Sequence, residues 1–387
     1  MNTNRRIVSA VITTFIVTVL LIAVSALWLF SEYGYTFEKL NKVLSVIEES
    51  YVGEYDLKRC EEGAINGLLE ALGDNYAVYY DEENAQETMQ FIEGYYVGVG
   101  IEVFANIDKG YIEVVSAFED SPADRAGIKG GDLIKSIDGI EYDISQMADA
   151  ILHMKGANVK DSLDKEIEIG LIRNGKEISV KVKREKIDMY KVTPKIVDDI
   201  CYIRYSGFTA DSLKNMKEII KNLDDSISGL VIDIRNNPGG EFGSAIDMCD
   251  MFMDDGLIMY TLDKNEKKTE FFAEKGSFDI PVAVLVNGFS ASASEIFAGS
   301  MQANGRGIIV GEKTYGKGVS QTVRYLNPYD KSEGALKLTT CKNYTPDGRW
   351  INDCIIPDVV VENSDIAEDI AKDPVFIEAV KSLKKDK

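Results

Sequence analysis

The most prominent hydrophobic pattern is an uncharged, mostly apolar stretch at residues 7–30, which follows Arg5 and Arg6 and precedes Glu32. As a helix rising about 1.5 Å per residue it would be about 36 Å long, enough to cross a hydrocarbon core of about 30 Å. Because the arginines come first, we expect the N-terminus in the cytoplasm and the rest of the chain outside. Small residues at 24–26 leave a cleaved signal peptide open as the alternative.

Two stripes of apolar residues at helical spacing follow this stretch: Phe37, Leu40, Leu44, Ile47 and Tyr51, then Ile65, Leu68, Leu69 and Leu72. Asp56 fits an N-cap before the second stripe, and Gly73 fits its end. We interpret residues 34–93 as a helical segment that packs or forms a dimer arm and has no chemistry of its own.

From about Gly94 the pattern changes to short strands, at residues 96–104 and 111–117, followed by S-P-A-D-R-A-G-I at 121–128 and G-D-L-I at 131–134. A G-x-G alone predicts only a turn, but this succession resembles a PDZ domain over residues 94–186. The resemblance implies a loop that holds a chain-terminal carboxylate with backbone amides, and a helix at 145–154 that faces it. The peptide-binding residues would then be Val99, Gly100, Ile101, Met147 and Ile151.

Beyond residue 187, strands predicted at 201–205, 229–235 and 282–287 alternate with helical stripes. This alternation indicates an α/β unit with an at least partly parallel sheet. Asp373 and Pro374 fit the N-cap and first position of a last helix within residues 364–387. We expect that helix to pack on the core or to mediate self-association into a homo-oligomer.

The candidate chemistry lies where an apolar run, V-A-V-L-V-N at 282–287, breaks into S-A-S-A-S-E at 290–295, followed by Y-G-K-G at 315–318. This order places a serine at a strand-to-helix corner, although S-x-x-E is also an ordinary helix capping box. The only histidine, His153, lies in a predicted helix far from any serine motif, so Lys317 is the better candidate base. A lysine base must be neutral, which requires its pKa to fall from about 10.4 to about 7–8 through burial.

These motifs, together with R-N-N-P-G-G at 235–240, closely resemble the carboxy-terminal processing proteases, also called tail-specific proteases. The resemblance covers roughly residues 36–362, and the spacing between the serine and the lysine matches the family's. It implies that Ser292 is the nucleophile, Lys317 the general base and Gln321 the residue that orients the lysine. It further implies an oxyanion hole made by the backbone amides of Gly239 and Ala293.

The resemblance implies a multi-domain α/β fold. Its predicted parts are a cytoplasmic stub and transmembrane anchor at 1–33, the helical segment at 34–93, the PDZ domain at 94–186, a crotonase-like α/β protease core at 187–363 and a C-terminal helix at 364–387. We expect a single-pass protein of the bacterial cell membrane with an extracytoplasmic catalytic domain.

The expected activity is that of a serine endopeptidase that uses a Ser-Lys dyad and recognises protein substrates by their C-terminal tails. The family implies no metal and no organic cofactor, and a regulatory partner protein is a further expectation. An inactive membrane-tethered tail-binding protein is the alternative, but the presence of both Ser292 and Lys317 favours the enzyme. A crotonase-like acyl-CoA enzyme would follow from fold analogy alone.

Composition limits the number of folded units, the partners and the roles of the cysteines. With 387 residues, 45% of them hydrophobic, the chain is expected to form two or three folded units. Its formal net charge of −21 argues against nucleic acid or an anionic membrane surface as the main partner. Its five cysteines are too few and too scattered for a disulfide framework or a metal site, although one bridge between Cys341 and Cys354 stays open.

Overall fold

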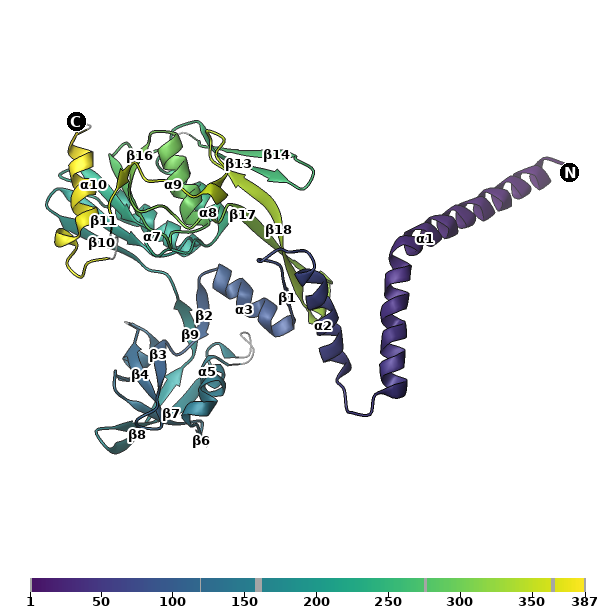
Figure 1. Cartoon of the computed structure of the whole chain (residues 1–387), viewed down its shortest axis with the longest axis horizontal. Helices are drawn as coiled ribbons and strands as arrows, with labels where there is room; N and C mark the ends of the chain where they lie inside the picture. Colours follow the sequence, from purple (N-terminus) through teal and green to yellow (C-terminus); the bar gives the residue numbers. More distant parts are fainter. Residues whose placement is uncertain (1, 119, 157–161, 275–276, 363–365, 386–387) are drawn as a thin grey trace. The chain divides into compact units, whose positions relative to one another are not determined.

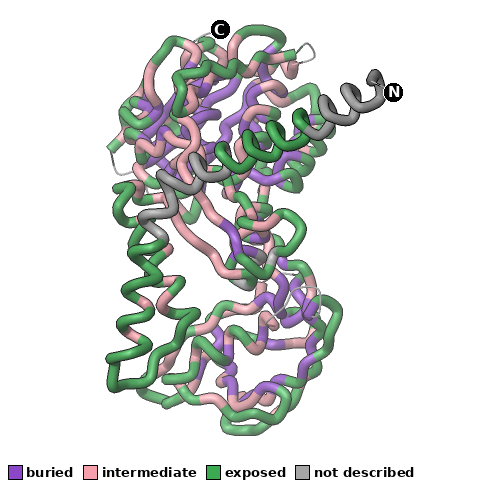
Figure 2. Tube along the Cα trace, turned by 90° about the vertical axis from the view of Figure 1, so that its right-hand side faces the viewer, coloured by how far each residue is buried: buried purple, intermediate pink, exposed green. Residues whose placement is uncertain are grey.

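The computed structural model describes residues 2–118, 120–156, 162–274, 277–362 and 366–385, without the side chains of residues 2–12, 25–37, 83, 86, 331 and 385. By its contacts the chain forms two compact units, Met1–Gly67 and Leu68–Lys387. Figure 1 follows the elements along the chain, and Figure 2 shows that the buried residues belong mainly to the second unit.

The first unit contains the long helix α1 (Asn2–Ser50) and the start of α2 (Leu57–Glu70). Asp56 caps α2 as predicted, because its Oδ1 accepts from the amide of Lys58 at 2.9 Å. The second predicted stripe does not form a core, since no residue of α2 is buried.

The predicted membrane anchor at residues 7–30 falls within α1, whose described apolar side chains in residues 13–24 are exposed. Residues 7–12 and 25–30 lie outside the described side chains. Across the residues that the structure does describe, no helix is both long and apolar enough to cross a membrane. The anchor is therefore not supported.

The region predicted to be a PDZ domain contains a six-stranded sheet in the order β3-β4-β5-β7-β8, with β6 paired to β5. Its strands are β3 (Ile101–Asn106), β4 (Tyr111–Ala117), β5 (Leu133–Ile137), β6 (Ile140–Glu141), β7 (Glu166–Arg173) and β8 (Lys176–Lys183). Three short helices accompany them: α4 (Pro122–Arg125), η1 (Ile144–Gln146) and α5 (Met147–Lys155). Alternating apolar residues of β7 turn inward onto one core cluster, as expected for a half-buried strand.

A two-stranded ribbon joins this region to its neighbours, with β2 (Tyr95–Gly98) antiparallel to β9 (Glu185–Asp188). The strand predicted at 96–104 is thus two strands, because the chain breaks between Gly98 and Ile101, where Gly100 has a φ of 79°. A side chain there would meet Ser121, since an added Cβ would lie 2.4 Å from Ser121 Cβ. Glycine is therefore required at this break.

The α/β core is built on a six-stranded sheet in the order β10-β11-β12-β15-β16-β19. Its strands are β10 (Val192–Val197), β11 (Ile200–Tyr205), β12 (Gly229–Asp233), β15 (Val282–Val286), β16 (Gly307–Gly311) and β19 (Val359–Val360). All neighbours are parallel except β10 and β11, so the predicted partly parallel sheet is confirmed. Every residue of β12 and β15 is buried, as is typical of strands covered on both faces.

Helices cover both faces of this sheet (Figure 1). One core cluster packs the sheet against α7 (Ala210–Lys221), α8 (Phe242–Asp250) and α9 (Ala293–Ala303). The other packs it against α10 (Pro374–Lys385), which follows η4 (Ile370–Lys372). Asp373 is the predicted N-cap, because its Oδ1 accepts from the amides of Val375 and Phe376 at 2.9 and 3.0 Å. The last helix therefore packs on the core.

A second sheet of the same unit brings the segment after α2 next to the C-terminal third of the chain. Its strands are β1 (Val78–Tyr80), β13 (Leu257–Asp263), β14 (Lys268–Phe272), β17 (Val319–Tyr325) and β18 (Ala335–Tyr344). The short β1 pairs antiparallel with the start of β18, and α3 (Glu82–Ile92) follows it. The remaining short helices are η2 (Lys331–Glu333) and η3 (Ile351–Asp353).

Candidate active site

Ser292 lies where β15 passes into α9, at the predicted strand-to-helix corner. It is the N-cap residue of α9, with φ 58° and ψ −114°. A positive φ is unusual for a residue with a side chain and costs about 1–3 kcal/mol, which the surrounding structure must supply. Such strained turns occur where a side chain has to stand at a helix N-terminus, and Ala293 at the first helical position has an amide without an acceptor inside the helix.

Glu295 connects the serine to the lysine loop. Its carboxylate is fully buried, and Oε2 accepts from the amides of Ser292 and Lys317, both at 2.8 Å. Its Oε1 accepts from Thr314 Oγ1 and from the amide of Gly316, both at 2.6 Å. One side chain therefore positions the backbone of the candidate nucleophile and of the candidate base. The sequence indicated Glu295 only as part of a helix cap.

The surroundings of Lys317 change its pKa in the direction that a lysine base needs. Burial lowers its pKa, the positive charge of Lys337 lowers it further, and Glu295 acts in the opposite direction. Its Nζ lies over the ring of Tyr76, 4.9 Å from the ring centroid. Within the described residues no hydrogen bond joins Lys317 Nζ to Ser292, so the structure brings their backbones together but not their reacting atoms.

Gly239 lies directly against the serine turn. An added Cβ would be 2.8 Å from Ala291 O and 2.9 Å from Ala293 N, and the φ of 104° at Gly239 also favours glycine. The two predicted oxyanion donors are thus neighbours. The amide of Gly239 donates to Asn237 Oδ1 at 2.9 Å, so a substrate oxygen would have to replace Asn237 as its acceptor.

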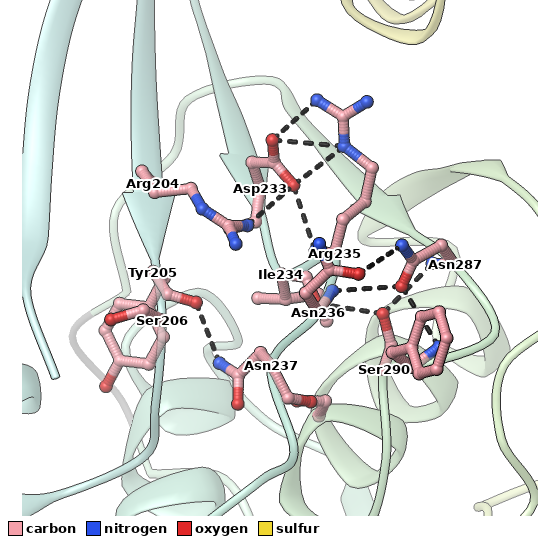
Figure 3. Close-up of polar contacts among 12 residues, drawn as sticks. Arg204, Tyr205, Ser206, Asp233, Ile234, Arg235, Asn236, Asn237, Asn287 and Ser290 are labelled. Atoms are coloured by element: carbon pink, nitrogen blue, oxygen red, sulfur yellow. Dashed lines mark hydrogen bonds and ion pairs between the residues drawn. The ribbon is translucent and has the colours of Figure 1, made fainter. Parts of the chain in front are cut away.

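A polar network fixes the loop after β12 to the loop after β15 (Figure 3). The amide of Asn236 donates to Asn287 Oδ1 at 2.9 Å, and Asn287 Nδ2 donates to Asn236 Oδ1 at 2.7 Å. Ser290 Oγ donates to Ile234 O at 2.8 Å, while Asn237 Nδ2 donates to a backbone carbonyl of β11 at 2.8 Å. These hydrogen bonds therefore hold the loops that carry Gly239 and Ser292 next to each other at the carboxyl end of the parallel strands.

A buried ion cluster adjoins this network at Asp233 and Arg235 (Figure 3). Arg235, Asp233 and Asp373 are fully buried, and Arg235 Nη2 lies 2.7 Å from Asp233 Oδ2 and 3.0 Å from Asp373 Oδ2. Burial alone would lower the pKa of Arg235, but its bonds and charges with both carboxylates raise the pKa instead. Tyr202 and Arg204 also reach Asp233, at 2.8 and 3.2 Å. The cluster ties the end of β12 to the start of α10.

Gln321 and His153 lie outside these contacts. Gln321 Nε2 donates to Val319 O at 3.4 Å, so its role in orienting Lys317 stays a prediction. On α5, His153 Nδ1 lies 2.9 Å from Tyr142 Oη and Nε2 lies 3.1 Å from Asp138 Oδ2. No serine partner of His153 occurs among the described residues, which agrees with the choice of lysine over histidine.

Three of the predicted peptide-binding residues, Ile101, Met147 and Ile151, are half-buried and pack against one core cluster. Val99 is buried rather than lining an open loop. The carbonyls of Val99 and Gly100 accept backbone hydrogen bonds, and β3 stands at the end of the strand order. The structure thus offers a sheet edge beside apolar side chains, and peptide binding there stays a prediction.

The cysteines are unpaired in the structure, Cys341 and Cys354 included. A turn lies between these two cysteines in the chain, since the amide of Gly348 donates to Thr345 O at 3.0 Å. Cys354 lies against the lysine loop, because a Cβ at Gly316 would be 2.9 Å from its Sγ.

Comparison with known proteins identifies the class. Residues 199–361 match peptidase family S41, and residues 29–84 match the N-terminal domain of the activating protease CtpB. A carboxy-terminal-processing protease of Bartonella bacilliformis is 35% identical over 341 residues, which are 84% of this chain and 76% of that protein. A probable CtpA-like serine protease of Staphylococcus aureus is 32% identical over 330 residues, 84% of this chain and 64% of that protein.

Solved structures of proteases of this class are also similar to this chain. The photosystem II D1 C-terminal processing protease is 25% identical with a TM-score of 0.50, and the match covers 84% of this chain and 87% of that one. A putative S41 protease from Bacteroides fragilis, 13% identical with a TM-score of 0.52 over 87% of this chain and 93% of that one, shows likeness in fold alone. The chain belongs to the carboxy-terminal-processing proteases, the serine-type peptidases of family S41. The family predicted from the sequence is thus confirmed, and proteins are its substrates.

Proposed function

We propose that this chain hydrolyses peptide bonds with Ser292 as nucleophile and Lys317 as general base. The observation that carries the proposal is the buried carboxylate of Glu295, which bonds the backbone of both residues through one oxygen. An ordinary helix cap needs no such link to a second loop. A lysine whose pKa is lowered by burial is the second support, because only the neutral amine can take a proton from serine.

In the proposed reaction, Ser292 Oγ attacks the scissile carbonyl carbon while neutral Lys317 takes the hydroxyl proton. The amides of Ala293 and Gly239 donate to the oxyanion, each worth roughly 3–4 kcal/mol where such donors have been removed. The tetrahedral intermediate collapses, the lysine gives its proton to the leaving amine, and water then releases the acyl group from Ser292 by the same route.

Two contacts have to change for this reaction. Lys317 Nζ must leave Tyr76 for Ser292, and the amide of Gly239 must exchange Asn237 Oδ1 for the substrate oxygen. We therefore assign the structure to a resting arrangement, with Gln321 expected to bond the lysine only after it has moved.

The dyad is tested by Ser292→Ala and Lys317→Ala, each of which should abolish hydrolysis of an unstructured protein while leaving thermal unfolding unchanged. Exposed residues provide matched controls, namely Ser226→Ala and Lys313→Ala. A fluorophosphonate probe should label the wild type at Ser292. Labelling that survives Ser292→Ala, or full hydrolysis by Lys317→Ala, would refute the assignment, and absence of both activities from the folded wild type would favour the inactive tail-binding protein.

We further propose that the region 94–186 is a PDZ domain that selects substrates by their C-terminal tails. The open edge of β3 beside Met147 and Ile151 supports this, since an extended tail can add a strand there. A degraded substrate with a free apolar C-terminus should be cleaved at least several-fold faster than its amidated form or a form extended by Asp-Asp. Equal rates for all three substrates would remove the basis for tail selection.

For location, the uncharged run at 7–30 after Arg5 and Arg6 leads us to propose an extracytoplasmic catalytic domain, with the run as anchor or signal peptide. Protease added to intact spheroplasts should digest the catalytic domain, and alkaline extraction separates the two forms. A membrane-retained chain means an anchor, whereas a soluble chain beginning near Leu27 means cleavage. Protection of the catalytic domain until lysis would contradict the proposed location.

A further inference from the structure

The catalytic lysine has one aromatic contact that the proposed reaction does not use. Lys317 Nζ lies 4.9 Å from the centroid of the Tyr76 ring. The face of an aromatic ring attracts an ammonium ion, whereas a neutral amine has no comparable attraction. The contact therefore favours the protonated lysine in this position.

Tyr76 is held beside the lysine by the segment that leads into β1. Asp74 accepts from the amide of Thr339 at 3.2 Å and from its Oγ1 at 3.1 Å, which clamps the segment onto β18. Asp74 also accepts from the amide of Tyr76 itself at 3.0 Å. Directly after it, β1 pairs with β18 from Val78 onward. The position of the ring is thus set by backbone and carboxylate bonds rather than by its own rotamer alone.

The charges around the pair are few. Lys337 and Glu295 act on Lys317, and Tyr315, Glu295 and Asp74 act on Tyr76. Burial is the main cause that raises the pKa of Tyr76, so its phenol is neutral at the pH of hydrolysis. The ring therefore acts on Lys317 through its face and not as a phenolate.

We propose that Tyr76 is a positioning residue that couples the protonation of Lys317 to its location. The ring holds the ammonium away from Ser292, and the amine that has lost its proton turns to the serine. This inference rests on the proposed function, since it takes Lys317 as the base. It assigns a role in the active site to a residue of the 34–93 segment, for which the sequence indicated packing or a dimer arm without chemistry.

Activity profiles test the coupling. In Tyr76→Leu the bulk that excludes water remains but the ring face is lost, so the acidic limb of kcat/KM should move to lower pH by about 0.5–1 unit. On that limb the rate rises roughly three- to tenfold, while the plateau at high pH stays unchanged. Tyr76→Phe keeps the ring and should retain the wild-type profile. Tyr95→Leu is the matched control, because the Tyr95 ring lies 4.5 Å from the Nζ of a different lysine, Lys186.

The proposal would be overturned if the acidic limb of kcat/KM did not move in Tyr76→Leu. It would also be overturned if kcat/KM fell equally at every pH, because that is the result expected of a purely structural role. If hydrolysis did not depend on Ser292 and Lys317, the proposed function itself would be refuted. If Tyr76→Leu does not fold, a measurement on the wild-type protein tests the coupling instead. The NMR signals of the Lys317 Hε protons, assigned by their absence from Lys317→Met, should show a ring-current shift that disappears as the lysine loses its proton. A ring-current shift that persists through the titration would equally refute the coupling.

Discussion

Replacing Glu295 by glutamine is the most informative single change to the site, because it keeps the shape and removes the charge. The carboxylate accepts four hydrogen bonds, two at each oxygen. A carboxamide has one oxygen and one NH2, so two of the four donors lose their acceptor. Rotation of the carboxamide decides whether its oxygen or its NH2 faces the amides of Ser292 and Lys317.

The four donors favour one orientation of this carboxamide. If the NH2 faced Ser292 and Lys317, two backbone amides would be left without an acceptor. If it faces Thr314 and Gly316, the hydroxyl of Thr314 can turn and accept, so the amide of Gly316 is the only backbone donor left without an acceptor. A buried unpaired donor costs about 1–3 kcal/mol, and bonds to a charged acceptor are worth about 1.5–3 kcal/mol each. We therefore expect Glu295→Gln to lower the free energy of unfolding by about 2–4 kcal/mol.

The catalytic effect follows from the same choice of side. With the NH2 toward Gly316, that end of the lysine loop loses its anchor, and a misplacement of about 1 Å can cost about 100-fold in rate. We expect kcat to fall 10- to 100-fold with little change in KM, because no substrate contact is removed. Urea unfolding and steady-state kinetics measure the two effects, with the exposed Glu218→Gln on α7 as control. Wild-type kcat and stability in a folded Glu295→Gln protein would refute the positioning role.

Further predictions concern the loops and the ion cluster. Gly239→Ala should lower the free energy of unfolding by at least about 2 kcal/mol and remove most of the activity, since its Cβ would meet Ala291 O and Ala293 N at a φ of 104°; an active, stable variant would contradict the close approach. Arg235→Met should destabilise by about 3–5 kcal/mol in urea unfolding, because the buried Asp373 would lose its ion pair with Arg235 and the buried Asp233 would keep Tyr202 and Arg204 as its side-chain partners, and a loss below 1 kcal/mol would argue against the cluster. Burial would raise the pKa of Asp373, but its hydrogen bonds and Arg235 lower it. The stability that this carboxylate contributes is therefore present above about pH 4 and lost as pH falls through its lowered pKa; the deficit of Asp373→Asn should shrink below pH 4, and a deficit independent of pH would contradict this linkage.

Local patterns were enough to predict much of this protein. The strands of the parallel sheet are continuous apolar runs, so β11, β12 and β15 start within a residue of their predicted positions. The corner at Ser292 and the cap at Asp373 were readable because both depend on neighbours within a few residues. The apolar pattern predicted one strand at 96–104, and only the resemblance to a PDZ domain implied a loop at Val99 and Gly100, where β2 and β3 are separate.

What the amino-acid sequence by itself determined is therefore three strands of the parallel sheet, the caps at Asp56 and Asp373, the family and the two candidate catalytic residues. Only the tertiary structure decided which distant residues serve them. Glu295 accepts from an amide 22 residues away, Arg235 meets a carboxylate 138 residues away, and Asp74 holds β18 across 265 residues. Hydrophobic period records only whether a side chain faces inward, and an inward acidic residue has the same pattern whichever donors it meets. The choice of donors is made when strands far apart in the chain pair, so the contacts that position Ser292 and Lys317 exist only in the folded chain.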